Sequence, residues 1–253
     1  MVKQFTPGTF SVYKLDGTVW YEKISHQKYY DMSSIFPRIT TMEESMHLIY
    51  STLNECVKRR VTTTERPIAC LLSGGLDSSL ITSLVAKHYT RDVSELQTYS
   101  IGMPGSEDLK YAKIVADFLG TNHTEIVLSE SEFFNAIPEV ICAIESYDTT
   151  TVRASVGNWL ICKKIKQQSN AKVIFNGDGA DEVCGSYMYL NCAPDSLNFD
   201  IECRRLLDDI HMYDVLRSDR SIASNGLEAR TPFLDKTFVQ TYLSIPAELR
   251  DHG

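Results

Sequence analysis

The stretch Pro67-Ile-Ala-Cys-Leu-Leu-Ser-Gly-Gly-Leu-Asp-Ser-Ser79 predicts a buried strand that turns sharply into a helix. Residues 68–72 form a short apolar run, and apolar residues recur at helical spacing from Leu80 onward. Between them, Ser73-Gly74-Gly75 lets backbone amides approach a ligand, because glycine has no Cβ. Unpaired amides and the positive end of the helix dipole meet in this turn, so it suits a phosphate.

This turn differs from the commonest phosphate-binding loop. A GxxxxGK[ST] loop holds a terminal phosphate with its lysine, and residues 73–79 contain no lysine. Glycine-rich turns between a strand and a helix also form for packing reasons alone. Phosphate binding is the favoured interpretation of this stretch, and a purely structural turn stays open.

The composition is that of a globular chain with a sizeable core. Of its 253 residues, 43% are hydrophobic, and the net charge is −8, which argues against nucleic acid as a partner. No apolar run reaches the roughly 20 residues that a membrane span needs, and the N-terminus lacks the apolar core of a signal peptide. Seven cysteines without a CxxC pair fit reduced thiols, so we expect a cytoplasmic protein without membrane contact.

Strand and helix patterns alternate along the chain. Residues 1–37 suggest a hairpin around Asp16-Gly17 that should pack on something larger, because a lone hairpin is marginal in water. The alternation after it predicts an α/β fold with a doubly wound parallel sheet, in which ligands lie beyond the carboxyl ends of the strands. The expected strands cover 68–72, 96–101, 124–128 and 172–175, and the expected helices 42–60, 107–119, 131–145 with a break at Pro138, 154–168 and 201–216.

A second glycine-rich loop, Asn176-Gly-Asp-Gly-Ala-Asp-Glu182, places three carboxylates within five residues after a strand. Carboxylates so close repel one another unless a cation lies among them. Glu182 could equally complement the dipole of the following helix. For Asp178 and Asp181 a role at a metal-phosphate site is favoured, because Asp77 adds a carboxylate at the same edge of the sheet and Mg²⁺ could bind there.

Two further stretches carry polar side chains at turns. Residues 146–155 bring hydroxyls and Arg153 to the start of a helix. Arg153 could bind a carboxylate or phosphate with two hydrogen bonds. A threonine cluster at such a position is more often a cap of the helix N-terminus. Residues 225–235 place Glu228, Arg230 and Asp235 around a proline turn. A structural salt-bridge cluster and a ligand contact are equally open for this second stretch.

Four blocks, in this order, resemble the synthetase domain of the glutamine-dependent asparagine synthetase family. The similarity runs from about residue 40 to the C-terminus and includes residues 211–217. The first of the four blocks is shared with enzymes making GMP, NAD and argininosuccinate, and the three later blocks are more specific to the family. The blocks are SGGLDSS at 73–79, YDTTTVRAS at 147–155, NGDGADEVCGSY at 176–187 and GLEARTPFLD at 226–235.

The resemblance implies a fold, a reaction and a set of ligands. The fold would be a doubly wound parallel sheet of the PP-loop ATP-pyrophosphatase type (adenine nucleotide alpha hydrolase-like), with a mainly helical C-terminal part. The side-chain carboxylate of aspartate would attack ATP to give β-aspartyl-AMP and pyrophosphate, and ammonia would then displace AMP to give asparagine. The implied residues are Leu71, Ile101, Asn176 and Gly177 around adenine and ribose, Ser73, Gly74, Gly75, Asp77 and Ser78 at the pyrophosphate, Asp77 and Asp181 at Mg²⁺, and Asp178 with Arg153 as candidate catalytic residues.

Three departures from the family pattern shape the expected organisation. Residue 2 is Val rather than the family's glutaminase cysteine, so we expect free ammonia, or ammonia from a separate glutaminase chain, as nitrogen source. We expect residues 1–37 to be a hairpin and linker remnant of a missing glutaminase domain, and residues 38–253 to be a C-terminally truncated synthetase domain without the family's later lysine. Asn176 replaces the usual serine, a change expected to matter little.

Two alternatives stay open at this point. The chain could be a catalytically impaired fragment that binds nucleotide or a partner, because the family's domain continues past residue 253. It could also be another acyl-adenylating ligase on the same scaffold, such as a β-lactam-forming cyclase. Substrate-dependent release of pyrophosphate separates all three possibilities.

Overall fold

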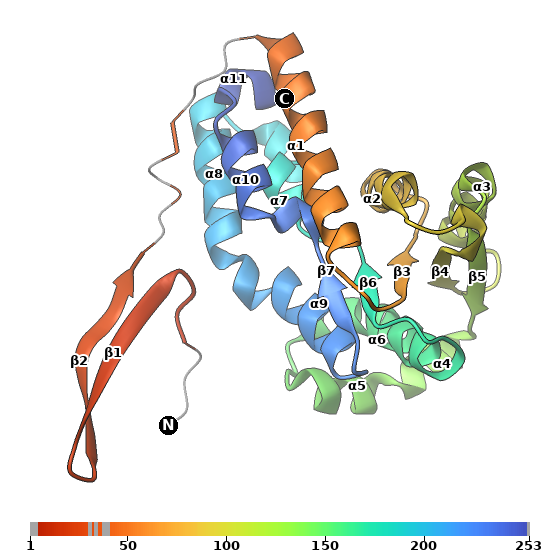
Figure 1. Ribbon diagram of the computed structural model, residues 1–253, viewed down its shortest axis with the longest axis horizontal. Coiled ribbons are helices and arrows are strands. Elements are labelled where there is room, and N and C mark those ends of the chain that lie inside the picture. The colour runs from red at the N-terminus through yellow and green to blue at the C-terminus, as the bar shows by residue number, and fades with distance from the viewer. Residues whose placement is uncertain (1–4, 30–31, 33–34, 37–40, 252–253) are drawn as a thin grey trace.

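A parallel sheet organises the body of the protein in the computed structural model, which describes residues 5–29, 32, 35–36 and 41–251 (Figure 1). Its strands are ordered β5-β4-β3-β6-β7, and every neighbouring pair is parallel. The doubly wound sheet expected from the sequence is therefore confirmed. The strands are β3 (Ile68–Leu71), β4 (Gln97–Gly102), β5 (Asn122–Val127), β6 (Val173–Phe175) and β7 (Glu228–Arg230).

The strand order reverses beside β3. The chain runs outward from β3 through β4 to β5, then returns to place β6 on the other side of β3, in register through Ile68 with Val173 and Cys70 with Phe175. Connections that leave β3 and β6 in opposite directions open a crevice at the carboxyl ends of these two strands. The first and second glycine-rich loops both start there.

Helices cover both faces of the sheet (Figure 1). The C-terminal part is mainly helical, as expected, and short 3₁₀ turns connect its helices. One face carries α1 (Met42–Thr62), α2 (Leu76–His88), α3 (Glu107–Leu119) and α10 (Lys236–Leu243); the other carries α4 (Glu130–Asn135), α5 (Ile137–Ile144), α6 (Thr149–Gln168) and α9 (Asp214–Ala223); α7 (Ala180–Cys184), α8 (Ser196–Asp209) and α11 (Ala247–Arg250) complete the fold.

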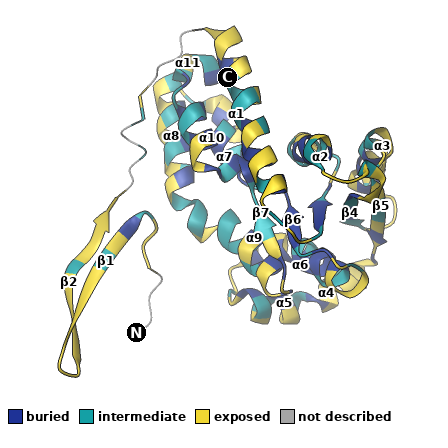
Figure 2. Ribbon diagram, in the orientation of Figure 1, coloured by how far each residue is buried: buried dark blue, intermediate teal, exposed yellow. Residues whose placement is uncertain are grey.

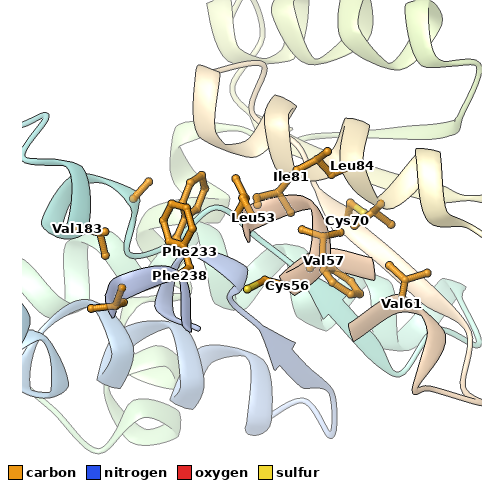
Figure 3. Close-up of a cluster of buried hydrophobic side chains, with 14 of the residues drawn as sticks. Leu53, Cys56, Val57, Val61, Cys70, Ile81, Leu84, Val183, Phe233 and Phe238 are labelled. Carbon is orange, nitrogen blue, oxygen red and sulfur yellow. The ribbon is translucent and has the colours of Figure 1, made fainter. Parts of the chain in front are cut away.

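Alternate residues of the central strands enter two separate cores. Cys70 and Phe175 point into a cluster with α1, α2 and α10, where Phe233 and Phe238 pack edge to face with ring centroids 5.7 Å apart (Figure 3). Ile174, which lies between Val173 and Phe175 in β6, joins the cluster formed with α5, α6 and α9. Burial on both faces explains why these strands read as continuous apolar runs rather than alternating ones (Figure 2).

Two predicted helices have different bounds in the structure. The helix expected from residue 154 begins at Thr149, because the Asp148 carboxylate caps it by accepting a 2.8 Å hydrogen bond from the Thr151 amide. The stretch 201–216 is not one helix: α8 ends at Asp209, a 3₁₀ turn follows, and α9 begins at Asp214. The strand β7 was not predicted.

The expected hairpin is present as β1 (Thr9–Asp16) and β2 (Val19–Lys28), with Gly17 at φ +61° in the turn. Among the described residues, the hairpin does not pack on the parallel sheet or its helices, so the expectation that it packs on something larger stays a prediction. Trp20 is 65% exposed, and the hairpin stands away from the body (Figures 1 and 2). In the part of the chain that the structure describes, no helix is long and apolar enough to cross a membrane.

A buried carboxylate fastens α1 to the C-terminal helices. Asp235 accepts hydrogen bonds from Arg59 at 2.8 Å, from Arg60, and from the Thr237 amide at 2.8 Å as the cap of α10. Burial alone would raise the pKa of Asp235, but the hydrogen bonds from Arg60 and Thr237 outweigh it and hold that pKa well below its usual range. The structure thus supports the structural interpretation of residues 225–235, with Arg59 and Arg60 as the unforeseen partners of Asp235.

We predict that Asp235→Ala lowers the free energy of unfolding by about 3 kcal/mol at pH 7, because it removes a cap and a buried partner of two arginines. The native pKa of Asp235 is depressed, so its contribution is complete above the unfolded-state pKa of about 4, shrinks below that value and is lost as pH falls through the native pKa. Urea unfolding at pH 7 and pH 3 measures both effects.

Asp117→Ala is the matched control, because Asp117 pairs with Lys113 at 2.6 Å on the exposed side of α3. It should change the free energy of unfolding by less than about 0.5 kcal/mol. Equal losses in the two variants at pH 7 would contradict a special role for Asp235.

Candidate functional site

A cavity of about 350 Å³ opens at the carboxyl ends of β3, β4 and β6. It lies where the strand order reverses, and both glycine-rich loops border it. The structure therefore brings together most of the residues that the sequence singled out. Those lining it are Leu71, Ser73, Gly75, Asp77, Ser78, Ile101, Asn176, Gly177, Asp178 and Asp181.

The first loop is held in shape by two serines. The Ser73 amide donates to Ser78 Oγ at 3.2 Å, and the two hydroxyl oxygens lie 3.0 Å apart. Gly75 is the N-cap residue of α2 and provides no side-chain cap. The start of α2 therefore faces the cavity with backbone donors that suit an anion.

Gly74 allows this loop to pack against α3. It has φ +81°, and a Cβ at this position would lie 2.4 Å from the backbone nitrogen of Ala112. Gly74 does not itself line the cavity, whereas its neighbours Ser73 and Gly75 do. The geometry gives Gly74 a packing role, and its expected contact with pyrophosphate stays a prediction.

The two glycine-rich loops touch at Gly177. A Cβ on Gly177 would lie 2.9 Å from the Ser78 backbone nitrogen and 3.1 Å from Asp77 Cβ. Any side chain here would force the start of α2 and the end of β6 apart. The glycine thus sets how closely donors from one loop and carboxylates from the other can surround a ligand.

Asp77 and Asp181 both line the cavity beside this contact. Burial raises the pKa of Asp77, and the negative charge of Asp181 raises it further. Two carboxylates in such repulsion offer hard oxygen ligands to a divalent cation. The described residues hold no group of three or more His, Cys, Asp or Glu side chains arranged for a metal. A donor set of two carboxylates therefore fits Mg²⁺ that also binds substrate phosphates.

Asp178 is held from several sides. Asn176 Nδ2 donates to Asp178 Oδ2 at 2.7 Å, and Arg217 Nη2 lies 3.8 Å from Asp178 Oδ1. Burial raises the pKa of Asp178, while Arg217 and a hydrogen bond from Ser218 lower it. The side chain of Asn176 is itself buried and also donates to Ser218 Oγ at 2.9 Å, so its polar atoms are already partnered.

Further acidic groups make the cavity strongly negative. Glu182 lies in the first turn of α7, as its dipole interpretation required, but it is buried, and Tyr187 donates a hydrogen bond to it. Burial raises the pKa of Glu182 to about 7, and Asp214 adds to the rise. Among the described residues lining the cavity, six are acidic, and Arg217 is the one Lys or Arg side chain.

Arg153 lies outside this cavity. It lines a second, more apolar hollow of about 1080 Å³, together with Thr149 and Val152 from the start of α6. The two hollows share Ile101, Asp108 and Gly157. The structure thus places Arg153 next to the cavity and not beside Asp178, so its candidate catalytic role stays a prediction.

Several lining residues carried no role in the sequence analysis. Arg217, Asp214 and Tyr187 belong to stretches that were noticed only through the family resemblance, and Asn158 reaches the cavity from α6. Arg217 is 39 positions beyond Asp178 along the chain, so no local pattern could pair them. The available signal was the block at 211–217, which lacked a chemical interpretation.

We predict that Gly74→Ala destabilises the protein far more than Gly105→Ala. Both glycines have φ +81°, so each substitution costs about 1–2 kcal/mol of backbone strain. A Cβ at Gly105 meets nothing within 4 Å, whereas one at Gly74 collides with α3, which adds about 2–3 kcal/mol. Thermal unfolding of both variants measures the difference, and equal losses would argue against the tight packing of the loop on α3.

Comparison with known proteins adds an independent line of evidence. The family model described as asparagine synthase matches residues 48–200 and 193–253. The asparagine synthetase [glutamine-hydrolyzing] of Homo sapiens is 43% identical over 229 residues, which are 89% of this chain and 40% of that protein. Its Gallus gallus counterpart is 41% identical over 84% of this chain and 37% of its own length. The chain thus spans about 40% of the length of these relatives.

Two solved structures show weaker likeness. The NMN synthetase of Francisella tularensis aligns over 59% of this chain and 60% of its own, with 17% identity and a TM-score of 0.36. The NH3-dependent NAD synthetase of Campylobacter jejuni aligns over 58% and 62%, with 16% identity and a TM-score of 0.37. These TM-scores lie below 0.5, so the assignment rests on the sequence matches. The family model covers the whole parallel sheet and both glycine-rich loops, and this chain belongs to the asparagine synthase family.

Proposed function

We propose that this chain carries out the ATP-dependent amidation of aspartate to asparagine through β-aspartyl-AMP, releasing AMP and pyrophosphate. One observation carries the proposal. In a chain of the asparagine synthase family, two glycine-rich loops meet at the reversal of strand order, with Asp77 and Asp181 close enough for one charge to raise the other's pKa. A triphosphate with its metal suits such a place.

The first loop would bind the pyrophosphate part of ATP. Ser73, Gly75 and Ser78 present hydroxyls and backbone amides at the start of α2, and oriented donors stabilise charge as it develops on a leaving group. The apolar side chains of Leu71 and Ile101 border the same cavity and suit the nucleobase. In this arrangement the α-phosphorus would lie between the two glycine-rich loops.

Asp77 and Asp181 would hold Mg²⁺. Magnesium, when bound, neutralises charge on the phosphates and the departing pyrophosphate. Such neutralisation matters here, because the described residues lining the cavity include six acidic side chains and one arginine, Arg217. ATP without its cation would be repelled from such a site.

The proposed reaction has two steps, activation of the carboxylate and attack by ammonia. A side-chain carboxylate oxygen of aspartate attacks the α-phosphorus, and the bond to pyrophosphate breaks. Ammonia next attacks the activated carbonyl, and AMP leaves with the electron pair of the broken carbon–oxygen bond, while the nitrogen gives up a proton. Asp178, whose Oδ1 faces Arg217, is the candidate group for orienting these steps. Arg153, in the adjoining hollow, is the candidate for binding a carboxylate of aspartate.

The nitrogen source is proposed to be ammonia, free or from a separate glutaminase chain. We expect ¹⁵N-labelled ammonium to enter asparagine and ¹⁵N-amide glutamine, supplied alone, to leave it unlabelled, because ammonia is the nucleophile proposed for the second step. Mass spectrometry of the product distinguishes the two. Label from glutamine in the purified chain would contradict this part of the proposal.

The acidity of the cavity favours one alternative, a protein that binds Mg-ATP without turnover. Arg217 is already paired with Asp214 and faces Asp178, so its charge is partly offset before any phosphate arrives. Mg-ATP binding without aspartate-dependent release of pyrophosphate would favour this alternative. Adenylation of a different carboxylate in a substrate screen would instead favour another acyl-adenylating ligase.

We predict that the chain, given aspartate, Mg-ATP and ammonium, releases pyrophosphate in step with asparagine. Asp77→Asn should lower both rates by about 100- to 1,000-fold, because removal of one electrostatic partner of the transition state costs roughly 3–4 kcal/mol. A coupled pyrophosphate assay with chromatography of asparagine measures both products.

Asp117→Asn makes the same chemical change at an exposed position of α3 and should leave both rates unchanged. Near-normal turnover in Asp77→Asn, or pyrophosphate release without aspartate in the unaltered chain, would overturn the proposed function.

A further inference from the structure

The buried side chain of Asn176 uses both of its amide hydrogens beside the cavity. It is 4% exposed, its Nδ2 donates to Asp178 Oδ2 at 2.7 Å and to Ser218 Oγ at 2.9 Å, and its Oδ1 accepts from the Asp178 amide at 3.4 Å. Both amide hydrogens are therefore used. The Asn176 side chain thus contacts both the carboxylate and the backbone amide of Asp178.

The backbone of Asn176 is fixed as well. Its amide donates to the carbonyl oxygen of Arg230 in β7 at 3.2 Å, which ties the end of β6 to the edge of the sheet. Ser218, the second acceptor of Nδ2, is 2% exposed and follows Arg217 in α9. Asn176 therefore connects three elements, β6, β7 and α9, around one carboxylate.

This arrangement gives the two oxygens of Asp178 different surroundings. Oδ2 is turned inward to the Asn176 amide, whereas Oδ1 lies 3.8 Å from Arg217 Nη2, a residue of the cavity wall. A serine at position 176 has a single hydroxyl hydrogen and could donate to one of the two acceptors only. The asparagine thus holds both acceptors at once, which a serine at this position could not do.

From this geometry we infer that Asn176 is a positioning residue, which fixes the orientation of the Asp178 carboxylate and couples it to α9. The expected effect of Asn176 on kcat rests on the proposed function. Its effect on the orientation of Asp178 rests on the described contacts alone. Its role differs from the nucleotide contact that the family resemblance implies for this position. It also replaces the expectation that asparagine in place of serine matters little.

The kinetic test compares variants of the full chain in the pyrophosphate assay. Asn176→Ala removes the amide that orients Asp178 Oδ2 and leaves Ser218 and Arg217 as the partners of this carboxylate. Misplacement of a reacting group by about 1 Å costs on the order of 100-fold, so kcat should fall by about that factor. The KM for ATP should stay within about threefold, because the groups that hold phosphate are untouched. Asn176→Ser, which keeps one hydrogen bond and little extra space, should give an intermediate kcat.

Asn225→Ala is the matched control. Asn225 is likewise buried at 5% exposure, and its Nδ2 donates to the carbonyl oxygens of Ser221 at 2.9 Å and Trp159 at 3.5 Å, away from Asp178. This variant should lower the melting temperature while kcat of the folded protein stays the same. Equal kcat values in Asn176→Ala, Asn225→Ala and the unaltered chain would overturn the kinetic part of the inference.

Crystal structures of the unaltered chain and of both Asn176 variants give a readout that needs no turnover. In Asn176→Ala the Asp178 carboxylate should leave its present orientation, because Oδ2 loses the bond from the Asn176 amide, and in Asn176→Ser it should stay closer to that orientation. An unchanged Asp178 in both variants would overturn the inference. If the unaltered chain releases no pyrophosphate, the proposed function fails, and the orientation of Asp178 alone decides this inference.

Discussion

The structure depends on one close approach, the contact between the two glycine-rich loops at Gly177. At that point the backbone of the second loop lies where a methyl group would meet the Ser78 nitrogen at 2.9 Å. The parallel sheet makes the approach possible, because β3 and β6 are neighbours whose connections leave in opposite directions. Hydrogen-bond donors from one loop and carboxylates from the other can then face a single ligand.

The same approach has an electrostatic cost. It places Asp77 near Asp181 and leaves Asp178, Glu182 and Asp214 around the same cavity. Burial and repulsion between neighbouring carboxylates raise the pKa values of several of these groups. A site built in this way is least stable when empty and gains most from a bound cation. The chemistry proposed for the chain uses this property, because its substrate brings both the cation and the phosphates.

Much of the fold could be predicted from sequence, and the failures have physical causes. The long strands and α3 have continuous or periodic apolar patterns, and their predicted positions agree with the structure to within one or two residues. By contrast, β7 is three residues long and contains Glu228 and Arg230, so no apolar pattern marks it. The start of α6 was placed too late because Asp148, rather than a later hydroxyl, caps it. The candidate site was predictable within each loop, whereas Arg217 and Ser218 reach Asp178 only through tertiary folding.

One chain of hydrogen bonds joins the candidate site to a distant helix end. The backbone amide of Asn176 donates to the Arg230 carbonyl, and the Arg230 side chain donates to the carbonyl of Arg60 at 3.1 Å. Arg60 lies in the last turn of α1 and its side chain is paired with Asp235. Coupling between two such places is reciprocal, since each can stabilise the other only by the same free energy. A nucleotide that orders the second loop would therefore also slow the fraying of α1 and shield the polar segment after it from proteases.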